Sequence, residues 1–153
     1  MDTTNTMTAG LTGGTQIPLG AHLVTPRRGY THHGIYVGNG RVVHYMGLSV
    51  AWRRGPVAEV TLEQFGAGRE VSIEAEACAA YTPIEVVQRA QSRVGEDAYD
   101  MLTNNCEHLC TWCAHGVSRS AQVDRLLAWP RRIAQDALSL FGTVFATTAA
   151  RRA

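Results

Sequence analysis

The hydrophobic residues of the chain fall into short β-rich runs up to about residue 73 and into helically spaced positions after residue 82. Residues 30–46 hold two such runs, separated by Gly38-Asn39-Gly40, and this pattern predicts a β-hairpin. Shorter runs bounded by Gly or Pro predict further strands at residues 21–24, 58–61 and 70–73, with a turn at 26–29.

Helix signals follow the strands along the chain. Thr82 is a good N-cap, and Pro83 suits the first helical position because its missing N–H is not needed there. The Asn104-Asn105 pair is a good N-cap for a second helix, which has Cys106 in its first turn. The order of strands first and helices afterwards predicts an α+β domain, with a small antiparallel sheet and helices packed on it. The predicted helices cover residues 83–94, 106–115, 121–129 and 133–145.

The totals set limits on size, partners and compartment. A chain of 153 residues is long enough for one domain with a core and too short for two. With a net charge of +1 and no long Lys/Arg run, nucleic acid is not expected as a partner. The first residues lack the basic start and apolar block of a signal peptide, so we expect a cytoplasmic protein with reduced cysteines. The predicted parts are a disordered tail (1–16), a folded domain (17–128) and an amphipathic C-terminal helix (129–153).

Cys106 is the strongest candidate for a reactive residue. In the first turn of a helix, unpaired backbone N–H groups and the positive end of the dipole favour the thiolate, which is the nucleophilic form. A free Cys in an apolar helix is more often an inert core residue, and that interpretation is kept for Cys110 and Cys113. For Cys106, the cap position and the histidines upstream favour catalysis.

A zinc site is the competing interpretation, because residues 106–115 contain three cysteines and two histidines. On one helix, however, Cys106 and Cys113 lie about 10 Å apart along the axis. Sulfurs that share a tetrahedral zinc ion lie about 4 Å apart. We therefore expect neither a metal nor a cofactor. Of the remaining histidines, we expect His108 to be a structural hydrogen-bonding residue and His22 and His115 to be surface or loop residues.

Three histidines on the predicted hairpin are candidates for the base: His32, His33 and His44. The length of the turn decides which of them are neighbours, since a one-residue slip exchanges the faces of a strand. A two-residue loop places His33 on the side of His44. A three-residue loop instead makes His32 the diagonal neighbour of His44, about 7–8 Å away by backbone, and puts Gly34 opposite His44. The spacing alone leaves both registers open.

Three segments carry a family pattern, namely GYTHHGIYVGNGRVVHY, IEVVQRAQSRVGEDAYDMLTNNCEHL and HGVSRSAQV. They resemble the lecithin–retinol acyltransferase-like family, including its phospholipase A/acyltransferase branch, over most of residues 17–123. The family pattern is His-x-[Gly/Ala]-Ile-Tyr-[Val/Leu]-Gly, a second His or other polar residue twelve positions after the first, and Asn-Cys-Glu-His. The resemblance implies Cys106 as nucleophile, His32 as base and His44 as its partner, with His33 at a variable position.

The resemblance also implies a circularly permuted papain-like (NlpC-type) fold, in which the histidine strands precede the cysteine helix. The implied chemistry is acyl transfer on lipid esters, as a phospholipase A or an acyltransferase, through a thioester on Cys106. The expected partner is a glycerophospholipid or another acyl ester. Two alternatives remain, a thiol peptidase or amidase of the same superfamily and a non-catalytic binding module. For residues 129–153, peripheral contact with a lipid surface and packing against the domain both stay open.

Overall fold

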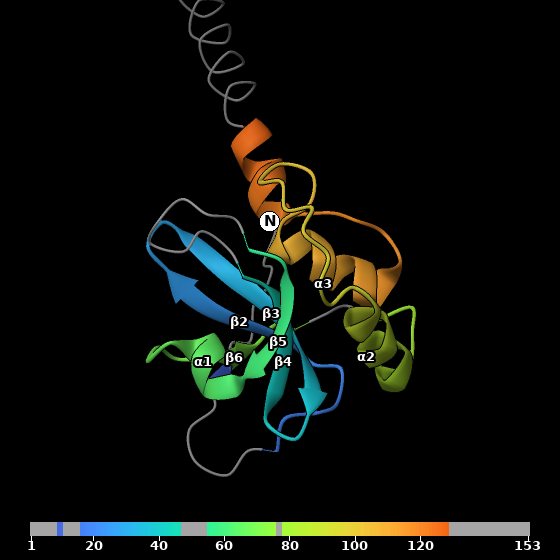
Figure 1. Cartoon of the computed structure of the whole chain (residues 1–153). Coiled ribbons are helices and arrows are strands. Elements are labelled where there is room, and N and C mark those ends of the chain that lie inside the picture. The colour runs from blue at the N-terminus through green and yellow to red at the C-terminus, as the bar shows by residue number, and fades with distance from the viewer. Residues whose placement is uncertain (1–8, 11–15, 47–54, 76–77, 129–153) are drawn as a thin grey trace, which may run out of the picture. The chain divides into compact units, whose positions relative to one another are not determined.

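The computed structural model describes residues 9–10, 16–46, 55–75 and 78–128. The chain forms two compact units, residues 1–120 and 121–153, and the sheet lies in the first. In the second unit, residues 121–128 are helical. The sheet has six antiparallel strands in the spatial order β1-β6-β2-β3-β4-β5 (Figure 1). The strands are β1 (Ala9–Gly10), β2 (His22–Arg27), β3 (Tyr30–Gly38), β4 (Arg41–Tyr45), β5 (Val57–Thr61) and β6 (Ser72–Ile73).

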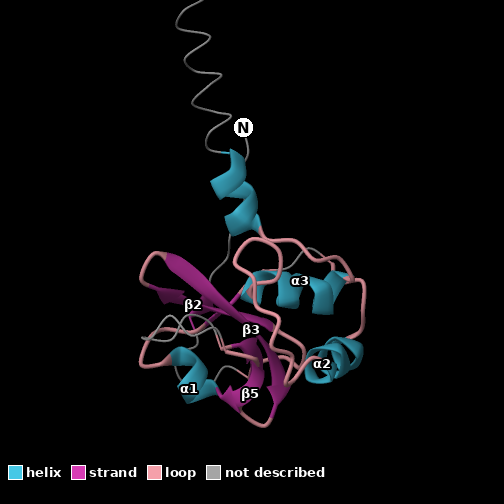
Figure 2. Ribbon diagram, turned by 45° about the horizontal axis from the view of Figure 1, so that its top comes forward, coloured by secondary structure: helices cyan, strands magenta, loops and turns pink. Residues whose placement is uncertain are grey.

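Helices cover both faces of the sheet (Figure 2). On one face, α2 (Pro83–Ser92) and α3 (Cys106–His115) pack around Ile35 of β3, and we refer to it as the α3 face. On the other, α1 (Leu62–Gly66) places Phe65 in a cluster with Leu23 and Val42, and we refer to it as the α1 face. Because side chains alternate along a strand, neighbouring residues of β3 contribute to different faces.

The hairpin of β3 and β4 combines features of both predicted registers. Its turn is the two-residue Asn39-Gly40 loop, with positive φ angles of 50° and 68°. The ladder then shifts by one residue and continues with Ile35 opposite Val43. This bulge restores the register of the longer loop, which places His32 and His44 on the same face. The predicted neighbours are therefore confirmed, although the turn is the shorter one.

The hydrophobic pattern alone does not predict α1, which is a single short helix after β5. Its N-cap is Thr61, whose side chain accepts from the backbone of Gln64 at 3.1 Å while the Gln64 side chain accepts from the backbone of Thr61 at 3.0 Å. This reciprocal pair is a capping box. The helix matters for the site, because it carries Phe65 to the α1 face.

The predicted α+β class is confirmed, with a small antiparallel sheet and helices on it. Within the tail predicted to be disordered, Ala9 and Gly10 differ from the prediction, because they pair with β6.

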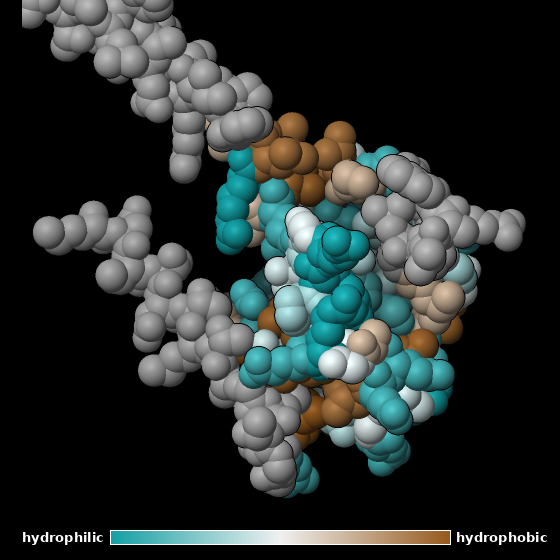
Figure 3. All heavy atoms as spheres, turned by 90° about the vertical axis from the view of Figure 1, so that its left-hand side faces the viewer, coloured by the Kyte–Doolittle hydropathy of each residue, from teal (hydrophilic) through white to brown (hydrophobic). Residues whose placement is uncertain are grey.

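The helix predicted over 129–153 lies outside the described residues. Among the residues described, no helix has both the length and the apolar character needed to cross a membrane. Figure 3 shows one face of the molecule, where hydrophilic residues surround smaller groups of hydrophobic ones.

Candidate active site

The N-terminus of α3 is fixed by a capping box. The Asn105 side chain accepts from the backbone N–H groups of Glu107 at 3.0 Å and His108 at 3.1 Å. In return, the backbone N–H of Asn105 donates to Nδ1 of His108 at 3.3 Å. The predicted cap and the structural role of His108 are both confirmed, and Cys106 occupies the first position of the helix.

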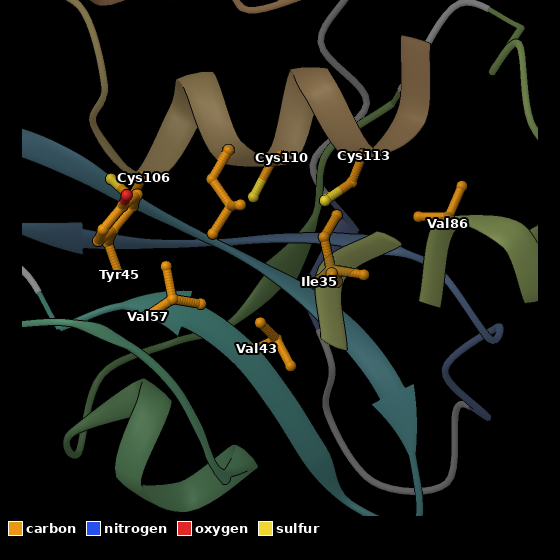
Figure 4. Close-up of a cluster of buried hydrophobic side chains, with 10 residues drawn as sticks. Ile35, Val43, Tyr45, Val57, Val86, Cys106, Cys110 and Cys113 are labelled. Atoms are coloured by element: carbon orange, nitrogen blue, oxygen red, sulfur yellow. The ribbon is translucent and has the colours of Figure 1, made fainter. Parts of the chain in front are cut away.

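The sulfur of Cys106 is buried, with only 4% of the residue exposed. Figure 4 shows it at the start of α3 beside Tyr45, while Cys110 and Cys113 lie further along the helix. Burial raises the pKa of Cys106 to about 11. The backbone N–H groups of His33, Glu107 and Cys106 itself act in the opposite direction without reversing this shift.

This result corrects the expectation that the helix terminus yields a resting thiolate. The N-terminal amides lower the pKa of a thiol, whereas burial away from water raises it. Here the desolvation of the anion outweighs them, and the nearby charge of Glu107 adds to the rise of the Cys106 pKa. At neutral pH the resting group is therefore the thiol.

His32 and His44 form a buried pair on the α1 face. Nε2 of His32 and Nδ1 of His44 share a hydrogen bond of 2.8 Å, and the ring centroids are 4.9 Å apart. The Phe65 ring stacks on His32 at 5.3 Å and meets His44 edge-on at 5.6 Å. Tyr30 contacts the His32 ring edge-on at 6.3 Å. These contacts hold both imidazoles in fixed orientations.

One nitrogen of this pair is left without a partner. Nδ1 of His32 is buried and makes no hydrogen bond. Buried polar atoms in proteins are usually bonded, so an exception points to a function or to a group that arrives later. Burial, with a smaller contribution from His44, lowers the pKa of His32 to about 3, and burial lowers the pKa of His44 to about 4. The pair is therefore neutral at physiological pH, and Nδ1 of His32 can present a lone pair.

The Cys106 thiol lies near the point where β3 and β4 stop pairing. The ladder between these strands ends at Ile35 and Val43. Beyond it, the backbone N–H of His33 donates toward the Cys106 sulfur. That nitrogen is bonded to the carbonyl carbon of His32, so the sulfur lies alongside the residue that carries the unpartnered Nδ1. The structure thus brings all three predicted residues to one end of the β3–β4 hairpin.

Arg27 was not among the predicted site residues, yet its guanidinium lies at this site. It donates to the carbonyls of Phe65 at 2.6 Å and Gly66 at 3.3 Å, and to the Thr25 hydroxyl at 3.1 Å. Its charge contributes to the lowered pKa values of His32 and His44. The only sequence signal is a basic residue at the end of β2, which is too common to single it out.

A second histidine pair lies on the α3 face. Nε2 of His22 and Nδ1 of His33 are 2.8 Å apart, and both residues are buried. The expectation that His22 is a surface or loop residue is therefore wrong, because β2 carries it into the sheet opposite Ile35. His115 is half-buried in the last turn of α3, so it is not a loop residue either. Within the described ranges, no group of three or more His, Cys, Asp and Glu side chains could hold a metal ion.

Comparison with known proteins shows the family of the chain. The family model described as lecithin retinol acyltransferase matches residues 15–119, so the chain belongs to this family, as its motifs predict. The bovine (Bos taurus) lecithin retinol acyltransferase is 30% identical over 148 residues, covering 79% of this chain. In that comparison the chain spans 64% of the relative's length.

Members of a second named group are similar as well. Human (Homo sapiens) phospholipase A and acyltransferase 2 is 32% identical over 121 residues, covering 69% of this chain and 75% of its own. Human phospholipase A and acyltransferase 3 is 28% identical over 134 residues, which cover 76% of this chain and 83% of the relative's length. Both names include phospholipase A and acyltransferase, which agrees with the branch suggested by the motifs.

Proposed function

We propose that this protein transfers acyl groups from lipid esters through a thioester on Cys106, with His32 as the base and His44 as its orienting partner. The observation that carries the proposal is the unpartnered Nδ1 of His32, buried beside the strand position that faces the sulfur. The names of the relatives, lecithin retinol acyltransferase and phospholipase A and acyltransferase, support lipid esters as donors.

The first half of the reaction forms the thioester. Nδ1 of His32 takes the proton from Cys106 while the sulfur attacks the ester carbonyl, whose π electrons move to its oxygen. The Cys106 N–H, at the start of α3, is a donor for this oxyanion. When the carbonyl reforms, the C–O bond to the alcohol breaks, and this leaving group takes the proton from His32.

The second half transfers the acyl group. A water, alcohol or amine gives its proton to His32 as it attacks the thioester, and the C–S bond breaks with return of the proton to sulfur. With water the reaction is that of a phospholipase A, and with another acceptor it is that of an acyltransferase. Throughout, Nε2–H of His32 donates to Nδ1 of His44, which keeps the basic lone pair on the other nitrogen.

The pKa shifts of Cys106 and His32 keep both side chains neutral in the resting protein, so they do not form an ion pair. The pKa of His32 lies near 3 and that of Cys106 near 11, so the proton stays on sulfur until a substrate is attacked. Proton transfer and attack are then coupled, which is general-base catalysis. Burial of the nucleophile would also protect the free enzyme from oxidation, because the thiolate is the reactive form.

We further propose that the fold is a circularly permuted papain-like one. Strands β3 and β4 carry the histidines and precede α3, which carries the cysteine, so the chain order is the reverse of that in papain. The proposed catalytic domain spans residues 17–128. Peripheral membrane contact through residues 129–153 stays a prediction, because these residues lie outside the described part of the chain.

The proposal is tested by incubating the protein with mixed glycerophospholipids and measuring its intact mass. We expect an adduct of one acyl chain on the wild type and none on Cys106→Ala. Cys110→Ala is a matched control, because this buried cysteine lies one turn further along the same helix. It should keep the adduct.

The other outcomes separate the alternatives. Absence of both an adduct and released fatty acid would exclude lipid acyl transfer. Cleavage of peptide or isopeptide substrates by the wild type, lost in Cys106→Ala, would then indicate a thiol peptidase. Inactivity on both substrate classes would indicate a non-catalytic binding module.

A further inference from the structure

A polar network surrounds Tyr45 on the α3 face of the sheet. The Tyr45 hydroxyl donates to the carboxylate of Glu96, and the Asn104 side-chain amide donates to the Tyr45 oxygen at 2.9 Å and to Glu96 at 3.1 Å. The same amide also donates to the carbonyl of Ala98 at 2.8 Å. Arg93 forms an ion pair with Glu96 through both carboxylate oxygens. The Glu96 carboxylate thus joins two side chains from its own part of the sequence, those of Arg93 and Asn104, to Tyr45, which is 51 residues away.

The backbone fixes Glu96 at this position. The N–H of Gly95 donates to the carbonyl of Val57, and the N–H of Val57 donates to the carbonyl of Glu96, each at 2.8 Å. Val57 is the register partner of Tyr45 in the β4–β5 ladder. The segment at residues 95–96 therefore docks on the outer edge of β5, directly beside the tyrosine it binds.

The network also reaches the middle of the catalytic helix. The guanidinium of Arg93 lies over the Trp112 ring of α3, 4.8 Å from its centroid. Arg93 and Glu96 are each only 24% exposed, so their charge-assisted bonds are partly shielded from water. The arginine is the main cause that lowers the pKa of Glu96 to about 2, and burial and the nearby carboxylate raise the pKa of Tyr45 to about 12. The carboxylate is therefore charged and the phenol protonated over the working pH range.

Two of these residues adjoin the nucleophile. Asn104 precedes the N-cap Asn105, so it lies two residues before Cys106. Tyr45 lies two residues beyond Val43, where the β3–β4 ladder ends, and it is fully buried in the same cluster as Cys106. Figure 4 shows the Tyr45 side chain reaching the start of α3 beside the sulfur.

We infer that Glu96 is a positioning residue, which acts through Tyr45 and Asn104 to hold the Cys106 sulfur against the strand that carries His32. This inference rests on the proposed function for the role of the sulfur. Its physical basis is that β4 no longer pairs with β3 beyond Ile35, so another contact must set the distance between the end of β4 and the helix terminus. Positional errors of about 1 Å in a reacting group can lower rates about a hundredfold.

The test compares Glu96→Ala, Glu96→Gln and Tyr45→Phe with the wild type. For Glu96→Ala we expect kcat of acyl transfer to fall about tenfold or more while KM changes less than about twofold, because substrate contacts are retained. Glu96→Gln should restore most of kcat, since its amide oxygen still accepts from Tyr45 and Asn104. Tyr45→Phe should resemble Glu96→Ala, because it removes only the hydroxyl.

The matched control is Glu59→Gln. Glu59 forms an ion pair of 3.0 Å with Arg41 near the β-hairpin turn, away from the nucleophile. Its variant should keep the wild-type kcat. Melting temperatures of all variants, measured alongside, show whether the comparison is made on folded protein. If Glu96→Ala is less stable but has unchanged kcat while folded, the network is only structural and the inference is wrong.

A second readout does not depend on lipid turnover. The rate of Cys106 alkylation by iodoacetamide, located by peptide fragmentation, reports the position and environment of the sulfur. Glu96→Ala should change this rate and its pH dependence, and Glu96→Gln should return both toward wild type. If no variant acylates but this pattern holds, the proposed function fails and the positioning inference survives. An alkylation profile that is the same in all variants would overturn the inference.

Discussion

Two buried histidine pairs lie on opposite faces of one sheet, and their distances are almost the same, although the rings cross at 86° in His32–His44 and at 48° in His22–His33. Each has an Nε2···Nδ1 distance of 2.8 Å, and the ring centroids are 4.9 Å apart for His32–His44 and 5.0 Å apart for His22–His33. Their surroundings differ. His32 has an unpartnered nitrogen, whereas His33 presents its backbone N–H to the sulfur and turns its ring toward His22.

Because both pairs have this bond, a short imidazole–imidazole hydrogen bond alone does not distinguish the proposed base. What distinguishes the α1 face is the aromatic layer of Phe65, the fixed charge of Arg27 and a lone pair with nothing to bind. The α3 face is the hydrophobic interior, where a histidine pair can serve packing and polar satisfaction alone. This contrast can be tested by changes of residue or of pH that should affect the two histidine pairs, His32–His44 and His22–His33, differently.

The largest effect is expected from exchanging the two adjacent histidines for alanine in turn. His32→Ala should lower kcat/KM about a thousandfold, because it removes the proposed general base. His33→Ala should keep most of the activity of the folded protein, since the backbone N–H that faces the sulfur remains. Its cost should appear in stability, because His22 loses a buried partner, at about 1–3 kcal/mol. Steady-state kinetics and thermal melts separate the two effects. Loss of activity in His33→Ala with retention in His32→Ala would reverse the assignment of the pairs.

The dependence of kcat/KM on pH should show whether the proposed base has the low pKa of His32 or the usual histidine pKa. A base with the usual histidine pKa of about 6.5 would lose about thirtyfold in kcat/KM between pH 8 and pH 5, because it becomes protonated. With the pKa of His32 near 3, kcat/KM should change less than about twofold over this range. On the alkaline side, alkylation of Cys106 should keep rising toward pH 11, since the thiolate forms only there.

The control for the pH dependence of kcat/KM is a measurement of folding at each pH. Far-UV circular dichroism across the same pH range shows whether the protein stays folded. A sharp fall of kcat/KM near pH 6.5 in folded protein would mean that water reaches the imidazoles during turnover. A Cys106 alkylation rate that levels off below pH 7 would mean a resting ion pair, and the general-base step would have to be abandoned.

Much of this site follows from the sequence because its signals are local. The Asn105 cap, the start of α3 and the Asn39-Gly40 turn are set by residues within a few positions of one another. The bulge that aligns His32 with His44 is not local, because it depends on how β3 packs between β2 and β4. The pattern therefore left two registers open, and the family motif favoured the one that is observed.

Burial caused the remaining differences. The first-turn position of Cys106 suggests a low thiol pKa, but the pKa depends on how completely the fold excludes water, which the sequence does not state. In the same way, the sequence does not indicate that the sheet buries His22. Arg27 and Phe65 join the site only through α1, a helix too short to give a periodic signal.

The smallest effect is expected at Gly34, which lies between His33 and Ile35 on β3 and faces the α1 face. A Cβ here would lie 2.6 Å from a methyl of Val42 and 2.8 Å from the Phe65 ring, so both side chains or the strand itself must move. Gly34→Ala should therefore cost about 1–3 kcal/mol of unfolding free energy. It should also lower kcat several-fold, because Phe65 stacks on His32. Denaturant unfolding and steady-state kinetics give the two quantities.

The reason for the expected asymmetry is that the added methyl points only to the α1 face. The His22–His33 pair lies on the other side of the strand, so its ring signals in NMR spectra should keep their positions while those of His32 and His44 shift. An equal shift in both pairs would mean that the strand moves as a whole. The His32–His44 pair would then not be held separately by Phe65, and its orientation would have to come from the sheet backbone.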